Sequence, residues 1–210
     1  MEILGSRIMH AIIGHRIAEI LEIEDRKSFM VGSIAADAVF SVDEKNASHF
    51  FVGDAEDYTR RVDFEGFLQK YSYEFDRKNP YLLGYYAHLV ADDIWLKGFY
   101  LSWLRNRMNA DKDLYKIYHN DFRLLNGKLI EHYRMANELK QAFSQFPEVI
   151  DIEEVKAKEV EELIPHVLGD MEYEQFGLDE ELKVFTLDQI VGYLETSIEL
   201  GVLKLREILK

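Results

Sequence analysis

The segment from Tyr81 to Trp95 constrains the fold more than any other part of the chain. It is almost wholly apolar, which is typical of a buried helix, yet it contains His88 and Asp92. Residues four apart lie one above the other on a helix, so the imidazole and the carboxylate face the same way. An unpaired buried carboxylate is costly, and both groups are standard ligands of Zn²⁺ and similar divalent ions. The pair therefore predicts a metal site in a helical core, with an intrahelical hydrogen bond as the alternative.

The rest of the chain favours an all-α fold, which we expect to be a multi-helix bundle. Only three of the 210 residues are proline, and apolar residues recur with the helical period. The first predicted helix begins after Ser6, and the last runs from the Thr186 capping box to Ile208. Between them we predict helices over 26–39, 63–73, 80–108, 111–146 (with a candidate break at 126–127) and 150–162.

One long segment, Ser41 to Asp63, lacks clear periodicity and is rich in Asp, Gly, Asn and Ser. We interpret it as a long loop, and loops of this length in compact domains are usually functional. No domain boundary is evident. We therefore expect a single helical domain over 1–210, with a metal-binding half at about 1–108 and a helical completion at about 109–210.

Composition excludes several classes of function. The net charge is −14, which argues against a nucleic-acid partner and against electrostatic docking on anionic membranes. No apolar run is long enough for a transmembrane segment, and the N-terminus lacks the pattern of a signal peptide. We therefore expect a cytoplasmic protein. Because cysteine is absent, any metal must be held by histidine and carboxylates.

Three further candidate ligands precede the pair in the chain: His10, Asp37 and His49. Each has an ordinary explanation when taken alone. His10 is typical of a satisfied core histidine, Asp37 of a helix cap, and His49 of a surface loop. All five candidates nevertheless lie within the first 92 residues and mostly on apolar segments, which favours a shared metal site.

Four short motifs in this order resemble the zinc-dependent phospholipase C family. They are Ser6-Arg-Ile-Met-His10, Gly32-Ser-Ile-Ala-Ala-Asp37, Ala47-Ser-His-Phe50 and Leu83-Gly-Tyr-Tyr-Ala-His-Leu-Val-Ala-Asp92. The resemblance covers roughly the N-terminal half of the chain. It implies a helical bundle of the phospholipase C/P1 nuclease type, and phosphodiester hydrolysis on a cluster of zinc ions.

The resemblance also implies roles for individual residues. Asp37, His49, His88 and Asp92 would hold one metal, and Asp92 would bridge to a second metal bound by His10. The implied cofactor is one or two Zn²⁺ ions, with other divalent transition metals as alternatives. Asp37 would in addition act as the catalytic base, because a ligating carboxylate can orient the attacking water.

The chain departs from the family pattern in the third metal site. The family has a histidine ten residues after the helix histidine, where this chain has Gly98, and the later His-x-x-x-Glu pair is absent. His119 and Asp121 are candidate replacement ligands or substrate contacts; a solvated helix face is the alternative. Secreted members also use their mature N-terminal residue as a ligand, which we do not expect of Met1.

The sequence therefore leads to two hypotheses of different classes. The first is a metal-dependent hydrolase acting on a small phosphoester or a phospholipid. The second is a non-catalytic helical protein in which a structural metal site supports a binding module. Other metal folds fit worse, because the chain contains no His-Asp dipeptide, no Glu-x-x-His and no His-Glu-x-x-His motif. The identity of the substrate and the oligomeric state are not encoded in any motif.

Overall fold

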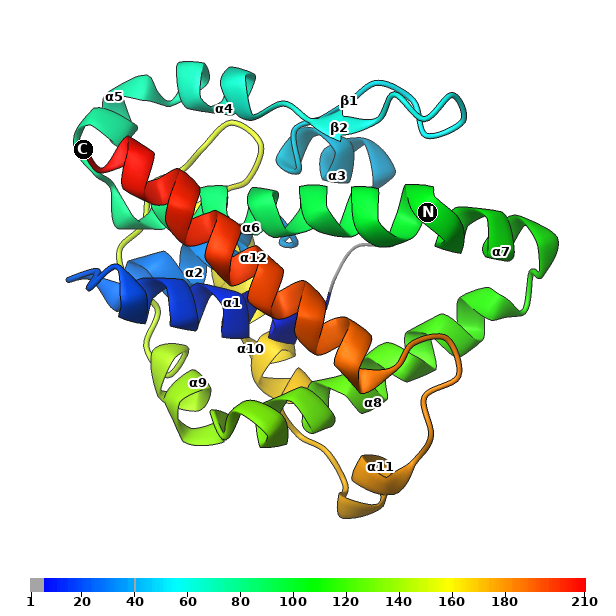
Figure 1. Cartoon of the computed structure of the whole chain (residues 1–210). Coiled ribbons are helices and arrows are strands. Elements are labelled where there is room, and N and C mark those ends of the chain that lie inside the picture. The colour runs from blue at the N-terminus through cyan, green and yellow to red at the C-terminus, as the bar shows by residue number, and fades with distance from the viewer. Residues whose placement is uncertain (1–5, 40) are drawn as a thin grey trace.

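The computed structural model describes residues 6–39 and 41–210, and it confirms the all-α prediction (Figure 1). The helices of this part of the chain are α1 (Arg7–Ile20), α2 (Arg26–Ala35), α3 (Val42–Ser48), α4 (Phe64–Lys70), α5 (Ser72–Asp76), α6 (Pro80–Trp95), the π-helix η1 (Leu96–Leu104), α7 (Arg105–Ala110), α8 (Leu114–Tyr133), α9 (Ala136–Ala142), α10 (Ala157–Asp170), α11 (Gln175–Asp179) and α12 (Leu187–Ile208). Two short antiparallel strands, β1 (Phe51–Val52) and β2 (Arg61–Val62), form a hairpin beside them.

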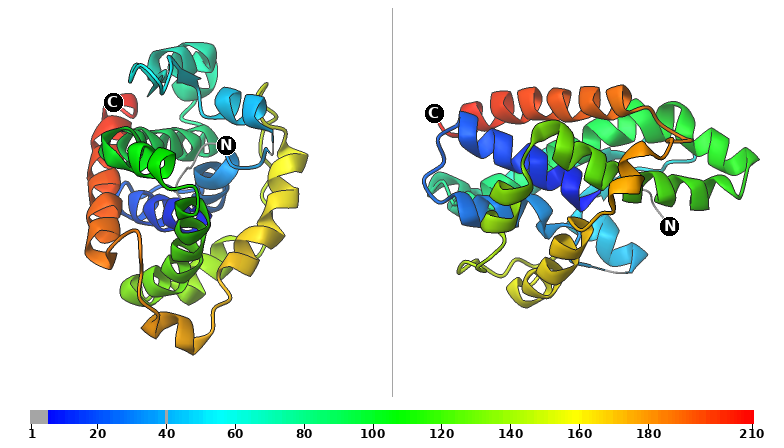
Figure 2. Two further views of the ribbon diagram at one scale, coloured as in Figure 1. Left: turned by 90° about the vertical axis from the view of Figure 1, so that its right-hand side faces the viewer. Right: turned by 90° about the horizontal axis from the view of Figure 1, so that it is seen from below.

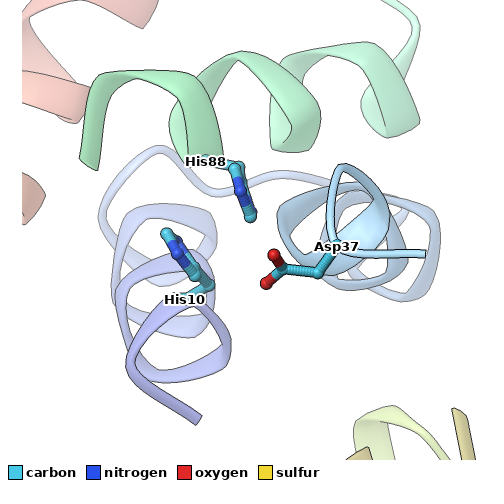
Figure 3. Close-up of side chains that lie close together, drawn as sticks. All are labelled: His10, Asp37 and His88. Atoms are coloured by element: carbon cyan, nitrogen blue, oxygen red, sulfur yellow. The ribbon is translucent and has the colours of Figure 1, made fainter. Parts of the chain in front are cut away.

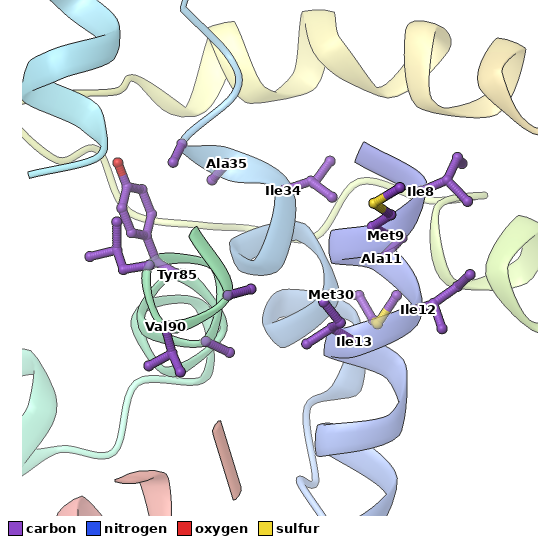
Figure 4. Close-up of a cluster of buried hydrophobic side chains, with 14 of the residues drawn as sticks. Ile8, Met9, Ala11, Ile12, Ile13, Met30, Ile34, Ala35, Tyr85 and Val90 are labelled. Carbon is purple, nitrogen blue, oxygen red and sulfur yellow. The ribbon is translucent and has the colours of Figure 1, made fainter. Parts of the chain in front are cut away.

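Helix α6 lies at the centre of the fold. It contacts α2, α1 and α12, which surround it on several sides (Figure 2). Its start was correctly predicted: the Asn79 side chain accepts hydrogen bonds from the backbone N–H groups of Tyr81 and Leu82, and Pro80 occupies the first position. Aliphatic side chains of α1 and α2 pack together beside α6 and form the core around it (Figure 4). The polar residues of α6 are therefore buried by helices from distant parts of the chain.

Two glycines allow α2 and α6 to approach closely. A Cβ atom added at Gly32 would lie 2.0 Å from the backbone oxygen of Tyr81, and one added at Gly84 would lie 2.0 Å from that of Phe29. Both distances are far below an ordinary van der Waals contact, so any side chain here would push the helices apart. This close packing brings the end of α2 next to the middle of α6.

The prediction of a long loop between Ser41 and Asp63 was wrong. The segment contains α3 and the hairpin of β1 and β2. Helix α3 is held by a capping box: the Ser41 side chain accepts from the Glu44 N–H, while the Glu44 carboxylate accepts from the Ser41 N–H. The Asp63 N–H then donates to the Phe50 carbonyl and closes the hairpin. His49 is therefore held on a structured segment.

Other helix boundaries also differ from the predictions. Helix α2 ends at Ala35 instead of 39, and helical structure after Asp63 continues through α5 to 76. The region 80–108 is helical throughout, as predicted, but its middle is the π-helix η1, which no sequence signal indicated.

In the C-terminal half, the helix predicted over 111–146 is divided into α8 and α9. Helix α8 runs unbroken through 126–127 and ends at Tyr133, and the next residue, Arg134, has a φ of 55° in the left-handed region. Helix α10 begins at Ala157, later than predicted, and contains Pro165 where an end was expected. Pro165 lacks the N–H that would bond to the Glu161 carbonyl, and its ring crowds that carbonyl, yet the helix continues to Asp170. The final helix α12 confirms its prediction, with the capping box of Thr186 and Gln189 in place.

Candidate metal centre

Four elements bring the five predicted ligands together. His10 comes from α1, Asp37 follows the end of α2, His49 caps the end of α3, and His88 and Asp92 come from α6. Figure 3 shows His10, His88 and Asp37 converging from three of these elements. No single helix could supply this set, which explains why the close approach of α2 to α6 matters.

The Asp92 carboxylate lies at the middle of the cluster. Its Oδ1 is 3.3 Å from His10 Nε2, and its Oδ2 is 3.2 Å from both His49 Nε2 and His88 Nε2. Asp37 Oδ1 is 3.6 Å from His49 Nε2. The rings of His10 and His88 are stacked with centroids 3.8 Å apart. Three imidazoles and two carboxylates thus meet in a space of a few ångströms.

The backbone fixes the tautomers of two of these histidines. His88 Nδ1 lies 2.8 Å from the Ser33 carbonyl oxygen, and His49 Nδ1 lies 2.8 Å from the Lys45 carbonyl oxygen. A carbonyl only accepts, so each Nδ1 must carry the hydrogen and each neutral ring presents an Nε2 lone pair. These two Nε2 atoms are 3.3 Å apart. Two lone pairs so close to each other and to a carboxylate favour a shared cation, which is a bound metal ion or, in the metal-free protein, a proton on one ring.

Several atoms in the cluster have no hydrogen-bond partner among residues 6–39 and 41–210. They are both ring nitrogens of His10, Oδ2 of Asp37, and both carboxylate oxygens of Asp92. The contacts of Asp92 with the histidines are within ion-pair distance but lack hydrogen-bond geometry. Unsatisfied buried polar groups are rare in native proteins, so their concentration here points to a missing ligand. Nitrogen and oxygen donors of these types match the preferences of zinc.

The charges in the cluster shift the pKa values of its members. Burial alone lowers the pKa of His88, but the carboxylates of Asp92 and Asp37 outweigh it and raise the pKa to about 9. Burial acts to raise the pKa of Asp92, yet the positive charges of His88 and His10 hold it well below its usual range. Burial lowers the pKa of His10. In the protein without metal, a proton on His88 therefore neutralises part of the carboxylate charge.

Within residues 6–39 and 41–210, two groups could hold a metal ion: His10 with Asp37 and His88, and His49 with His88 and Asp92. The ligand atoms of each group lie within 4.8 Å of one another. The family resemblance divides the ligands differently, with His10 and Asp92 at the second metal. In this structure His10 lies beside Asp92 and also beside the Asp37 and His88 pair. His88 is common to both groups, so it is the ligand whose loss affects the whole cluster.

The structure does not bring His119 and Asp121 into this cluster. His119 is exposed, with its ring against Tyr115. Asp121 is buried, and its carboxylate accepts hydrogen bonds from the backbone N–H groups of residues 183–185. Asp121 thus stabilises the segment that leads into α12. Residues 1–5, which include the N-terminal position considered above, lie outside the described residues.

The sequence did not indicate the groups that support the ligands. The Ser33 and Lys45 carbonyls orient two histidines. Every residue has a backbone carbonyl, so the residue type does not indicate this role. Tyr85 donates a hydrogen bond of 2.5 Å to the Ser48 carbonyl and so fixes the residue next to His49 to α6. Tyr85 lies one turn before His88 on α6, and that spacing was the one available signal.

Comparison with known families gives a match over the part of the chain that carries the ligands. A family model described as zinc dependent phospholipase C matches residues 9–134, more than half of the chain. All five clustered residues lie in this range. No curated protein matches the chain, and no solved structure does. Within the described residues, no helix combines the length and apolar character needed to cross a membrane.

Proposed function

This chain belongs to the zinc-dependent phospholipase C family, and from that membership and its metal centre we propose that it is a metal-dependent hydrolase of phosphodiesters, with phospholipids as the substrate class. The ligands come from the part of the chain before residue 108. We propose that residues 109–210 complete the same helical domain.

The observation that carries the proposal is the set of buried nitrogen and oxygen atoms around Asp92 that have no hydrogen-bond partner among the described residues. Zinc would be held by His10, Asp37, His49, His88 and Asp92, whose ligand atoms already face one another. When bound, zinc supplies Lewis-acid chemistry, because it lowers the pKa of coordinated water and polarises phosphoryl oxygens. The chain contributes the fixed orientation of the ligands through its backbone carbonyls, which raises their basicity.

Asp37 is the ligand best placed to meet a reacting water. Its side chain is 10% exposed, whereas those of His49 and Asp92 are fully buried. Its Oδ2 has no hydrogen-bond partner in the described part of the chain. Although burial acts in the opposite direction, the neighbouring histidines lower its pKa, so the carboxylate is ionised. An ionised carboxylate at this position can accept a hydrogen bond from the attacking water and orient it, and we propose that it also receives the water's proton.

A structural metal site is the second candidate, and one observation favours it. His10, His49, His88 and Asp92 are almost fully buried, as expected for the closed ligand set of a structural zinc. The two candidates differ in whether the centre keeps a position open for water. That difference is best tested by activity in fully metallated protein.

The test is a panel of esters given to the zinc-loaded protein: phosphatidylcholine vesicles, bis(p-nitrophenyl) phosphate and p-nitrophenyl phosphate. We expect hydrolysis of the two diesters, and a loss of about 100-fold or more in Asp37→Asn, the scale of losing a general base. Asp93→Asn is the matched control, because Asp93 pairs with Lys97 outside the cluster and should leave activity unchanged. If the wild type, with zinc measured as bound, hydrolyses none of the three esters, the structural-site candidate is correct.

A further inference from the structure

Helix α12 lies outside residues 9–134 but packs against both α1 and α6, which carry three of the five ligands. Figure 1 shows α12 crossing α1 and α6. Tyr193, in the second turn of α12, is buried by this contact. The part of the chain that the family model does not cover thus contributes an aromatic hydroxyl to the neighbourhood of the ligand helices.

The ring of Tyr193 is held on the side of α6 that carries Asp92. It packs edge-on against Trp95, with centroids 5.1 Å apart and an interplanar angle of 76°, and against Phe99 at 6.0 Å. Trp95 lies three residues after Asp92, and residues at this spacing share a face of a helix. The position of the Tyr193 ring is therefore set by aromatic packing.

The Tyr193 hydroxyl has no hydrogen-bond partner among the described residues. The Ser197 hydroxyl is close enough to affect its pKa, but Ser197 donates its own hydrogen to the Tyr193 carbonyl at 2.8 Å, and the two hydroxyls lack hydrogen-bond geometry. A buried unpaired hydroxyl costs about 1–3 kcal/mol. The nearby Trp95 Nε1 is a second buried donor without a partner in this part of the structure. Two buried donors without partners thus belong to a pair of rings that pack together, on the face of α6 that carries Asp92.

The electric field at Tyr193 keeps its hydroxyl protonated. Burial raises the pKa of Tyr193 well above its ordinary value, and the negative charges of Asp92 and Asp37 raise it further. The hydroxyl is therefore a neutral donor on which the charges of two metal ligands act. No described residue accepts its hydrogen, and an anionic oxygen would be the strongest acceptor for it.

We propose that the Tyr193 hydroxyl donates a hydrogen bond to a phosphoryl oxygen of the substrate bound at the metal centre. This inference rests on the proposed function, because it assumes that a phosphate group binds there. Phosphoryl oxygens are anionic acceptors, and a hydrogen bond to a charged group is stronger than one between neutral groups. The unpaired hydroxyl in the substrate-free protein is then explained as a preformed contact.

The test uses Tyr193→Phe, which removes only the hydroxyl. Its matched control is Tyr81→Phe, since the Tyr81 hydroxyl is also buried and unpaired in the described structure. The charges that raise the pKa of Tyr81 are those of Asp151 and Tyr71, and no metal ligand is among them. The measurements on the zinc-loaded proteins are zinc content, melting temperature, affinity for inorganic phosphate by calorimetry, and kcat and KM on bis(p-nitrophenyl) phosphate.

We expect Tyr193→Phe to bind phosphate about 10- to 100-fold more weakly, the scale of a hydrogen bond to a charged group. Its zinc content should match that of the wild type, and its melting temperature should be equal or higher, because the substitution removes a buried hydroxyl that has no partner in the absence of phosphate. Tyr81→Phe should bind phosphate as the wild type does. If the wild type binds phosphate but hydrolyses no ester, the proposed function fails while the affinity difference still supports the inference.

Three results would overturn the inference. One is an unchanged phosphate affinity in Tyr193→Phe, and another is a zinc-loaded wild type that does not bind phosphate. The third is a melting temperature lowered in Tyr193→Phe, because such a loss would show that the hydroxyl already makes a stabilising hydrogen bond in the protein without phosphate.

Discussion

Replacing Gly84 by alanine should separate α6 from α2 and weaken the metal centre. The added Cβ would lie 2.0 Å from the Phe29 carbonyl oxygen and 3.0 Å from the Ser33 nitrogen, both backbone atoms that cannot rotate away. An ordinary contact begins at 3.4 Å, so the helices must move apart by about 1.4 Å. The His88 Nδ1 contact with the Ser33 carbonyl, now 2.8 Å, would then exceed hydrogen-bond range.

Overpacking of this kind costs about 3 kcal/mol at the upper end of its usual range. For a chain of this length, that corresponds to a decrease in melting temperature of roughly 6–12 °C. Calorimetry of the metal-free protein would measure this decrease, and competition with a chelator would measure a lower zinc affinity.

The matched control is Gly192→Ala in α12, where an added Cβ has no atom within 4 Å. This variant should keep or slightly raise the melting temperature, since alanine is the better helix former by about 1 kcal/mol. A Gly84→Ala protein with wild-type melting temperature and zinc affinity would refute the reasoning that glycine contacts between α2 and α6 position the ligands.

Two further predictions follow from the charges of the site and its surroundings. In the metal-free protein the raised pKa of His88 contributes stability that is fully present below about pH 6.5 and is lost as pH rises through about 9. Because zinc displaces this proton, zinc affinity should rise with pH up to about 9. Chelator competition at several pH values would check this rise, and a pH-independent affinity would contradict it. Asp121→Ala should lower the free energy of unfolding by about 3 kcal/mol, since it leaves the buried N–H groups of Val184 and Phe185 unpaired. The amount of zinc bound per protein should not change. Loss of zinc with a stable fold would instead make Asp121 a ligand.

The sequence predicted the fold class and the helices with strong local signals. Asn79-Pro80 and the Thr186 capping box each act within one turn, so their positions could be predicted correctly. The segment from Ser41 to Asp63 was misinterpreted because its capping box is followed by a short helix with no sustained apolar period. Pro165 was misinterpreted as a helix end, although α10 continues past it.

The candidate site could be predicted in part for the same reason. The spacing of His88 and Asp92 is local, and the structure places their Nε2 and Oδ2 atoms 3.2 Å apart. The roles of Asp121 and Tyr193 were not predicted, because they depend on partners at least 60 residues away in the chain. Contacts of this kind are set by helix packing, and no local pattern encodes them.

The measurement that tests the central claim most directly is the zinc content of His88→Ala, by elemental analysis after equilibration with excess zinc and gel filtration. His88 belongs to both groups of ligands, so its loss should reduce zinc from one or two ions per chain to nearly none. His119→Ala, which removes an exposed histidine outside the cluster, should keep the wild-type content. Zinc retained at the wild-type level in His88→Ala would contradict the account of the metal centre.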